Sequence, residues 1–290
     1  MKLTALSGAA SLLILAACAS SAIEDAGSPA DILPPPAMDA MDADPARIQA
    51  AVADANRPET DVERDDLRKP AEVLAFMDIA PGSDILEMEA GGGYFTEIFS
   101  RYVGEDGTVF MQNPAAFDGF LGDGPEERAT ALGNVEYVKA QFDDLPLDDE
   151  SVDAATWFQG PHELWYAPPN GEPLVASPDD SFPEIFRVLK PGGTFVVLDH
   201  TAPEGSPATI GGDTHRIDPQ IVRDLAREAG FVLIMESELF DNADDDLTAN
   251  VFDEAVRGRT DQFLMKFNAR NDSDEEILAL ERWRLTGNLE

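Results

Sequence analysis

The chain has 290 residues, 43% of them hydrophobic, which is enough to bury the core of one large α/β domain or two small ones. Its 57 acidic residues outnumber 20 Lys and Arg residues, and the formal net charge is -37. Such a surface repels phosphate backbones and anionic lipid headgroups, which disfavours nucleic acid as a partner. A solvated, highly soluble surface also accounts for this charge, so the charge identifies no partner.

The first 18 residues have the composition of an export signal. One basic residue is followed by an apolar stretch from Leu3 to Ala17 and by Cys18, the single cysteine of the chain. The stretch is shorter than the roughly 20 apolar residues that cross a bilayer comfortably. Residues 15–18, Leu-Ala-Ala-Cys, resemble the bacterial lipobox, in which Cys18 would be acylated. An ordinary signal peptide with an incidental cysteine is the alternative.

We therefore expect a lipoprotein signal peptide over residues 1–18 and a flexible tether over residues 19–44, which are rich in Ala, Pro, Asp and Ser. Ala19 stands where inner-membrane lipoproteins often carry a retention residue such as Asp. This favours the outer membrane facing the periplasm, with the lipid anchor as the only membrane contact. A single cysteine allows no intrachain disulfide.

The remaining chain alternates between helical and strand patterns. Helical spacing over 48–56 and 62–79, interrupted by Pro70, predicts an N-terminal helical extension. Strands are predicted at 84–88, 108–112, 135–139, 152–158, 194–199, 231–237 and 262–267. Helices are predicted at 94–103, 182–189 and 219–229, and a turn at 190–193. This order predicts an α/β fold, a doubly wound and mostly parallel seven-stranded sheet, in a domain of residues 45–270. Residues 271–290 are expected to form a charged peripheral tail.

Three segments of this domain together resemble a known family. A strand runs into Gly91-Gly92-Gly93 and then a helix, a turn that either admits a ligand to the helix N-terminus or only reverses the chain. Phe-Asp-Asp-Leu-Pro-Leu follows at 142–147, and Arg-Val-Leu-Lys-Pro-Gly-Gly at 187–193. In this order, over residues 65–240, they resemble class I, Rossmann-type, S-adenosylmethionine-dependent methyltransferases. Residues 91–94, 112–114, 215–219 and 257–263 resemble a narrower group of predicted exported bacterial methyltransferases.

The resemblance implies S-adenosylmethionine as the cofactor. Glu87 would hold its amino group, two glycines would line its methionine end, and Asn113 would take the position of the acid that binds the ribose. Phe142 and Asp143 would approach the adenine. The implied cofactor-binding residues are Glu87, Gly91, Gly93, Asn113, Phe142 and Asp143.

Two residues depart from the family pattern. Glu89 stands at the first glycine of the turn, where a tight backbone is expected. Asn113 lacks the charge that makes a carboxylate's hydrogen bond about twice as strong as a neutral one. Both departures reduce the cofactor affinity that the resemblance implies.

The three histidines of the chain all follow predicted strands. Ligands of doubly wound folds bind at the carboxyl ends of the strands, where His162, His200 and His215 are expected. We expect His162 to be a base or a substrate ligand, oriented by Glu163, with His200 and His215 as further catalytic candidates. An ordinary loop histidine is the alternative for each.

Nearby aromatic residues have two interpretations. They either wall a pocket for an apolar acceptor or pack in the core and a lid. They are Trp157, Phe158, Trp165 and Tyr166. The His, Glu and Asp residues here also suit zinc or iron, but no His-x-x-x-His or Cys-x-x-Cys spacing supports a metal site, and none is predicted.

The sequence therefore predicts a methyltransferase that acts on a small molecule or an envelope component. A non-catalytic ligand-binding lipoprotein that kept the fold is the alternative, favoured slightly by Glu89 and Asn113. A structural lipoprotein without a ligand is a third possibility, disfavoured by the glycine turn and the placement of the histidines.

Overall fold

The computed structural model describes residues 42–166 and 176–270. The expected signal peptide with Cys18, the tether up to residue 41 and the tail over 271–290 lie outside these residues. Within the described stretches, no helix combines the length and the apolar character that crossing a bilayer requires.

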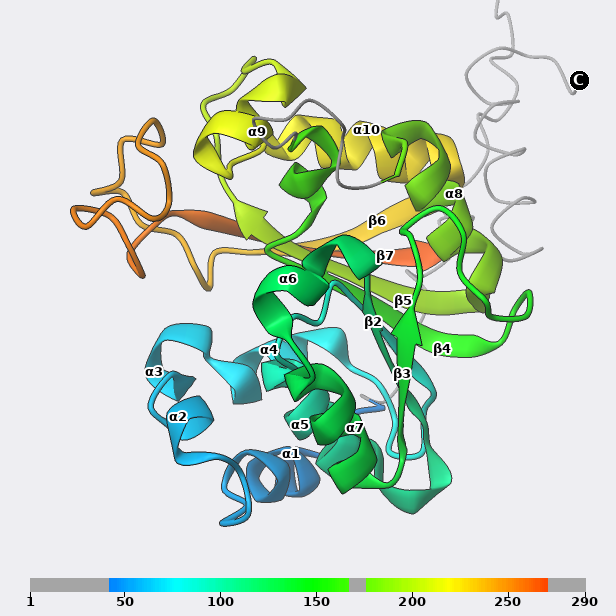
Figure 1. The fold of residues 1–290 in the computed structure, drawn as a ribbon. Coiled ribbons are helices and arrows are strands. Elements are labelled where there is room, and N and C mark those ends of the chain that lie inside the picture. The colour runs from blue at the N-terminus through cyan, green and yellow to red at the C-terminus, as the bar shows by residue number, and fades with distance from the viewer. Residues whose placement is uncertain (1–41, 167–175, 271–290) are drawn as a thin grey trace, which may run out of the picture. The chain divides into compact units, whose positions relative to one another are not determined.

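A seven-stranded sheet lies at the centre of the domain, in the order β3-β2-β1-β4-β5-β7-β6 (Figure 1). Neighbouring strands are parallel except where β7 pairs with β5 and β6. The predicted doubly wound, mostly parallel sheet is therefore confirmed. The strands are β1 (Ile85–Met88), β2 (Val109–Asn113), β3 (Val135–Lys139), β4 (Val152–Phe158), β5 (Leu189–His200), β6 (Phe231–Ser237) and β7 (Gln262–Ala269).

Helices cover both faces of this sheet. One apolar cluster joins the strands to α1, α4 and α5, and a second joins them to α8 and α10. Figure 1 shows α8 and α10 on the side of the sheet opposite to α1, α4 and α5. The longer helices are α1 (Pro45–Val52), α4 (Pro70–Met77), α5 (Tyr94–Val103), α7 (Gly124–Leu132), α8 (Pro178–Val188) and α10 (Pro219–Ala229). The short ones are α2 (Glu59–Val62), α3 (Asp65–Arg68), η1 (Gly104–Asp106), η2 (Ala115–Phe117), α6 (Asp118–Leu121), η3 (Pro161–Trp165), η4 (Ala208–Ile210) and α9 (Gly211–Thr214).

The N-terminal helical extension begins where the expected tether ends. The Asp44 side chain accepts hydrogen bonds from the first turn of α1, and Pro45 stands at the first helical position. Pro70 opens α4 rather than breaking a longer helix, because its missing N–H costs nothing in the first turn. Ala43 already contacts Asp78, so the folded domain starts slightly before residue 45.

Two predicted boundaries need correction. The expected turn at 190–193 lies inside β5, because Leu189 already pairs with Val152 before Thr194 pairs with Ala154. The extra residues form a bulge in which Gly192 adopts φ 79°. Helix α8 begins at Pro178 rather than 182, since proline at a first helical turn does not prevent a helix.

The segment 215–219, His-Arg-Ile-Asp-Pro, follows α9 and leads into α10, and its Ile217 pairs with Thr201 just after β5. Asp218 caps α10 by accepting from the Gln220 N–H. Arg216 is fully buried and forms a bidentate pair with Asp245, with N···O distances of 2.8 and 3.0 Å. It also donates to the backbone carbonyls of Thr201 and Ala249, which ties residues 245–249 to the sheet.

Replacing Asp245 with alanine is expected to destabilise the fold by roughly 3–5 kcal/mol, because it leaves the buried Arg216 charge without its partner. Urea denaturation followed by circular dichroism measures this. Asp224→Ala is the matched control: its partner Arg227 is 63% exposed, so we expect a change within about 0.5 kcal/mol. Equal losses in the two variants would contradict a structural role for the buried pair.

Candidate functional site

The turn after β1 is held open by its own backbone geometry. Glu89, Gly91 and Gly93 all have positive φ, at 51°, 56° and 82°. The side chain of Asn113 accepts from the Gly91 N–H at 2.8 Å and donates to the Gly91 carbonyl at 3.0 Å. A β-carbon added at Gly91 or Gly92 would meet no atom within 4 Å, so this part of the turn faces open space. The turn is therefore not blocked by neighbouring side chains.

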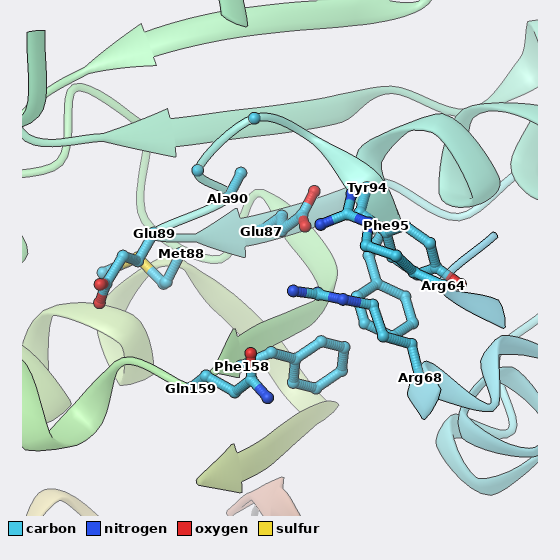
Figure 2. A pocket seen from close by; sticks show the side chains of 12 residues that line it. Arg64, Arg68, Glu87, Met88, Glu89, Ala90, Tyr94, Phe95, Phe158 and Gln159 are labelled. Carbon is cyan, nitrogen blue, oxygen red and sulfur yellow. The ribbon is translucent and has the colours of Figure 1, made fainter. Parts of the chain in front are cut away.

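A cavity of about 220 Å³ lies against this turn, which we call the glycine-turn cavity. Figure 2 shows the guanidinium groups of Arg64 and Arg68 on the same side as the Glu87 carboxylate, whereas the Glu89 carboxylate points away from them. The cavity therefore offers guanidinium and carboxyl groups to a ligand. It is lined by Arg64, Arg68, Glu87, Met88, Glu89, Ala90, Gly91, Gly92, Tyr94, Phe95, Phe158 and Gln159.

Glu87 lies at the buried end of this cavity and is 4% exposed. Burial raises its pKa to about 8, although the Thr96 hydroxyl, which donates to the carboxylate, and the nearby Arg68 oppose the shift. The carboxyl group is therefore largely protonated near neutral pH in the absence of a ligand. A ligand ammonium group would favour its ionised form.

The arginines of the glycine-turn cavity are placed by Tyr94, the first residue of α5. The guanidinium carbons of Arg64 and Arg68 lie 4.9 and 4.8 Å from the centre of the Tyr94 ring. The Tyr94 hydroxyl donates to Asp65, which in turn pairs with Arg57. Arg64 pairs with Asp61, whereas none of the ion pairs among the described residues involves Arg68. Arg68 is thus the cation available to a ligand anion.

Several expected cofactor residues are not brought to the cavities described here. Asn113 is fully buried, and its amide is occupied by the Gly91 backbone. Phe142 is fully buried and packs against Trp157, and Asp143 accepts from the Ser177 N–H. Gly93 does not line the cavity either: a β-carbon there would collide with Arg128 and Met111, so close packing explains the glycine. Glu87 and Gly91 line the glycine-turn cavity, and these four residues do not.

A second cavity, of about 380 Å³, lies at the carboxyl ends of β4 and β5. We call it the histidine cavity, because all four predicted catalytic residues, His162, Glu163, His200 and His215, line it. Aromatic side chains form much of the remaining wall. Its lining is completed by Glu89, Gly91, Phe117, Phe120, Gln159, Tyr166, Val251 and Phe252.

Asp199, at the end of β5, positions His162. Its Oδ1 lies 2.7 Å from His162 Nδ1, and its Oδ2 accepts from the His162 backbone N–H at 3.0 Å. The Nε2 atom of His162 then faces His215 Nδ1 at 3.2 Å and Glu163 Oε1 at 3.5 Å. The Glu163 and His215 atoms are 3.1 Å apart. His200 lies outside this contact group, with its Nδ1 on the Thr260 hydroxyl.

The environments of these groups separate their pKa values. Burial would lower the pKa of His162, but the Asp199 and Glu163 carboxylates outweigh it and raise it to about 10. Burial opposes ionisation of Glu163, yet its bonds to His162 and His215 lower its pKa to about 2. Burial lowers the pKa of His200 to about 4. His200 is therefore neutral at pH 7, whereas His162 is an imidazolium in the protein as described and is not a base in that state.

Two glycines allow the histidine cavity to form. A β-carbon at Gly211 would lie 2.5 Å from the His162 carbonyl, so only glycine lets α9, which precedes His215, approach η3. A β-carbon at Gly160 would collide with the Glu89 carboxylate and the Trp157 indole. These close approaches connect segments far apart in the sequence, which spacing alone does not reveal.

Glu89, Gly91 and Gln159 line both cavities and form their shared wall. The Glu89 carboxylate accepts from the Trp157 indole N–H at 3.0 Å. Burial and the neighbouring Glu163 raise the pKa of Glu89 well above its ordinary value. Glu89, at the first position of the turn, therefore lies between the two cavities. Its side chain does not cover the backbone of Gly91 and Gly92.

Of the four aromatic residues singled out in the sequence, two line a cavity and two pack in the core. Phe158 lines the glycine-turn cavity and Tyr166 the histidine cavity. Trp157 is fully buried, and Trp165 packs against the same core cluster. No local sequence motif marks five other residues that line the cavities, because they come from separate loops and helices: Arg64, Arg68, Phe117, Phe120 and Phe252.

Comparison with known proteins agrees with this architecture. Residues 86–197 match the sequence model of a family described as a methyltransferase domain. The chain is 32% identical over 153 residues to the ubiquinone/menaquinone biosynthesis C-methyltransferase UbiE of Cronobacter sakazakii, covering 51% of this chain and 56% of that protein. UbiE of Erwinia tasmaniensis is 30% identical over 151 residues, covering 51% and 56%. The chain thus spans about half the length of the curated relatives it matches.

Solved structures share the fold at lower identity. A SAM-dependent methyltransferase from Aquifex aeolicus has a TM-score of 0.52 and 20% identity, covering 78% of this chain and 98% of that chain. The geranyl diphosphate C-methyltransferase from Streptomyces coelicolor, solved with S-adenosyl-L-homocysteine, has a TM-score of 0.51 and 17% identity, covering 76% and 89%. The matched segment and the strand order together show that the described chain has the Rossmann-type fold of the class I methyltransferases.

Proposed function

We propose that the protein is an S-adenosylmethionine-dependent methyltransferase that acts on a small molecule or an envelope component. The observation that carries the proposal is the meeting of two cavities at Glu89, Gly91 and Gln159. The glycine-turn cavity alone is smaller than the roughly 300 Å³ at which ligand sites usually begin. In this proposal a ligand of cofactor size would therefore extend past these three residues into the histidine cavity.

The glycine-turn cavity is complementary to an amino-acid zwitterion. Glu87 would accept from the ammonium group of the methionine end, and Arg68 would pair with its carboxylate. The exposed backbone of Gly91 and Gly92 permits close approach of the ligand. This arrangement supports the role of Glu87 implied by the family resemblance and adds Arg68 to it.

The shared wall is where the sulfonium group would lie. Glu89 brings a carboxyl group to this position, and a cation beside it favours the ionised form. From there the adenosine would pass Gly91 towards Phe117 and Phe120, whose rings offer a stacking surface. These aromatic residues would replace the contacts expected of Asn113, Phe142 and Asp143.

The methyl group would then face the histidine side of the second cavity. The acceptor's nucleophilic atom would form a bond to the methyl carbon while the carbon–sulfur bond breaks, which leaves S-adenosylhomocysteine with a neutral thioether sulfur. The acceptor's proton passes to His200, which is neutral at pH 7. Phe252 and Tyr166 favour an acceptor with an apolar or aromatic body.

The comparisons support this proposal over a ligand-binding module without catalysis. The matched family is described as a methyltransferase domain, and the two UbiE relatives are named as methyltransferases. Glu89 slightly favoured the alternative because it stands where a tight backbone is expected, but the Trp157 indole N–H binds its carboxylate at 3.0 Å.

The affinity for S-adenosylhomocysteine tests the role of Glu87. This ligand lacks the sulfonium charge, so its pH dependence reports the contact between its ammonium group and Glu87. We expect its affinity to rise between pH 6 and about pH 8, because binding the ligand ammonium requires the Glu87 carboxylate and releases its proton. Above the pKa of the ligand's own amino group the affinity falls again, because that group loses its charge. Calorimetry on the full chain in buffers of different ionisation enthalpy measures the affinity and the proton release.

Glu87→Gln is expected to weaken this binding by about 10–100-fold at pH 8 and to abolish the rising limb. Glu136→Gln, the same change on an exposed residue of β3, is the matched control and should leave both unchanged. Absence of S-adenosylhomocysteine and S-adenosylmethionine binding at millimolar concentration would contradict the proposed function.

We further propose that Cys18 is acylated and anchors the protein at the outer membrane facing the periplasm. In cell fractionation, the wild-type chain is expected with the membranes and Cys18→Ala with the soluble fraction, because each buried methylene of an acyl chain contributes about 0.8 kcal/mol to membrane binding. Retention of Cys18→Ala on the membrane would contradict acylation at this residue. A periplasmic location would also require a supply of S-adenosylmethionine outside the cytoplasm.

A further inference from the structure

Three donor atoms in the histidine cavity form a nearly equilateral triangle. His162 Nε2, His215 Nδ1 and Glu163 Oε1 are separated by 3.2, 3.1 and 3.5 Å. Zinc binds nitrogen and oxygen ligands at about 2.0–2.2 Å, and ligands at that distance from a tetrahedral centre lie about 3.4 Å apart. The three atoms therefore already have the spacing of three corners of a tetrahedral metal site.

His162 is oriented as metal-binding histidines are. Such histidines donate the ring N–H that faces away from the metal to a carboxylate or carbonyl group. Here Asp199, fully buried, bonds His162 Nδ1 at 2.7 Å and also accepts from the backbone N–H of His162 and of His200. The carboxylate thus holds the ring with Nε2 directed at the other two donors.

His215 is held from both sides of the chain. Its backbone is left-handed, with φ 57°. Residues other than glycine rarely adopt this conformation, and those that do are concentrated at functional sites. Gly211, before it, allows the close approach to His162, and Arg216, after it, is anchored by the buried pair with Asp245. The position of the His215 ring therefore depends on structure that the neighbouring residues provide.

The charge of the cavity favours a cation. Asp199 and Glu163 place two carboxylates in the group, and no Lys or Arg occurs among the described residues that line the cavity. All three histidines of this strongly acidic chain line this one cavity. We propose that His162, Glu163 and His215 bind a divalent transition-metal ion, with zinc the best match to their spacing, and that its fourth position faces the histidine cavity.

The fourth coordination position of the metal ion suggests a role for the ion in methyl transfer, and this role rests on the proposed function. An oxygen or sulfur atom of the acceptor could occupy it beside the transferred methyl group. A zinc ion held there would lower the pKa of such a ligand, so that the acceptor's proton would pass to His200 before the methyl group is transferred. The methyl-accepting atom would then be a hydroxyl oxygen or a thiol sulfur. The sequence alone did not predict this site. His162 and Glu163 are adjacent and His215 follows His162 by 53 positions, so the three residues form no motif with metal-ligand spacing.

Zinc titration of the chelator-treated full chain tests the site. We expect one Zn²⁺ bound per chain, in competition with a chromophoric chelator and in excess Mg²⁺ to suppress weak binding by surface carboxylates. His215→Ala and Glu163→Gln are expected to weaken binding at least about 100-fold, and Asp199→Asn by about 10–100-fold. His200→Ala, in the same cavity but outside the cluster, is the matched control and should change the affinity less than about threefold.

Imidazole NMR signals provide a second readout that does not depend on activity. The chain has only three histidines, so each signal can be assigned from the corresponding His→Ala variant. One equivalent of Zn²⁺ is expected to shift the signals of His162 and His215 and to leave that of His200 nearly unchanged. Circular dichroism of each variant distinguishes loss of a ligand from loss of the fold, and Glu163→Gln tests the site if a histidine variant does not fold.

The outcomes separate the metal site from the proposed function. Two results would overturn the metal site. One is binding of one Zn²⁺ per chain by both His215→Ala and Glu163→Gln, and the other is a wild-type chain that binds no Zn²⁺ in excess Mg²⁺. S-adenosylhomocysteine binding by a chain that binds no zinc would leave the methyltransferase proposal standing without the metal. Zinc binding that the two ligand variants abolish, in a chain that binds no S-adenosylhomocysteine, would support the metal site alone.

Discussion

The arrangement of the site depends on the buried carboxylate of Asp199. It lies at the carboxyl end of β5 and accepts from the backbone and the ring of His162, which follows β4. A buried carboxylate without such donors would cost several kcal/mol, so these bonds are required by burial itself. By meeting that requirement, the chain holds the loops after β4 and β5 in one position. The geometry of the histidine cavity follows from this constraint.

The parallel strands supply the rest of the site. Because β1, β4 and β5 run in the same direction, the glycine turn and the histidine loops leave the sheet at one edge. Their contact is possible only where side chains are absent, at Gly160 against Glu89 and at Gly211 against His162. The two cavities thereby share a wall, and a cofactor in one can present a reacting group to the other. The proposed chemistry is a consequence of this adjacency.

The sequence predicted the strands well because each is a short apolar run bounded by turn residues; β3, β4, β6, α5 and α10 begin and end where expected. It also placed the histidines at the working edge, since strand order determines which loops meet there. Roles that depend on long-range contacts were not predictable. The bonds of the Asn113 amide to the Gly91 backbone could not be read from its family position, and Arg68 reaches the cavity from a short helix with no motif. Periodicity reports which face is buried, not which distant side chain fills a given space.

In the proposed complex, one cofactor molecule spans both cavities and its sulfur atom lies at their shared wall. A crystal structure of the full chain with S-adenosylhomocysteine tests this most directly. We expect the amino-acid end between Glu87 and Arg68, the sulfur beside Glu89, and the adenine against Phe117 and Phe120. A cofactor whose sulfur lies away from Glu89, or a glycine-turn cavity that stays empty at saturating ligand, would contradict it.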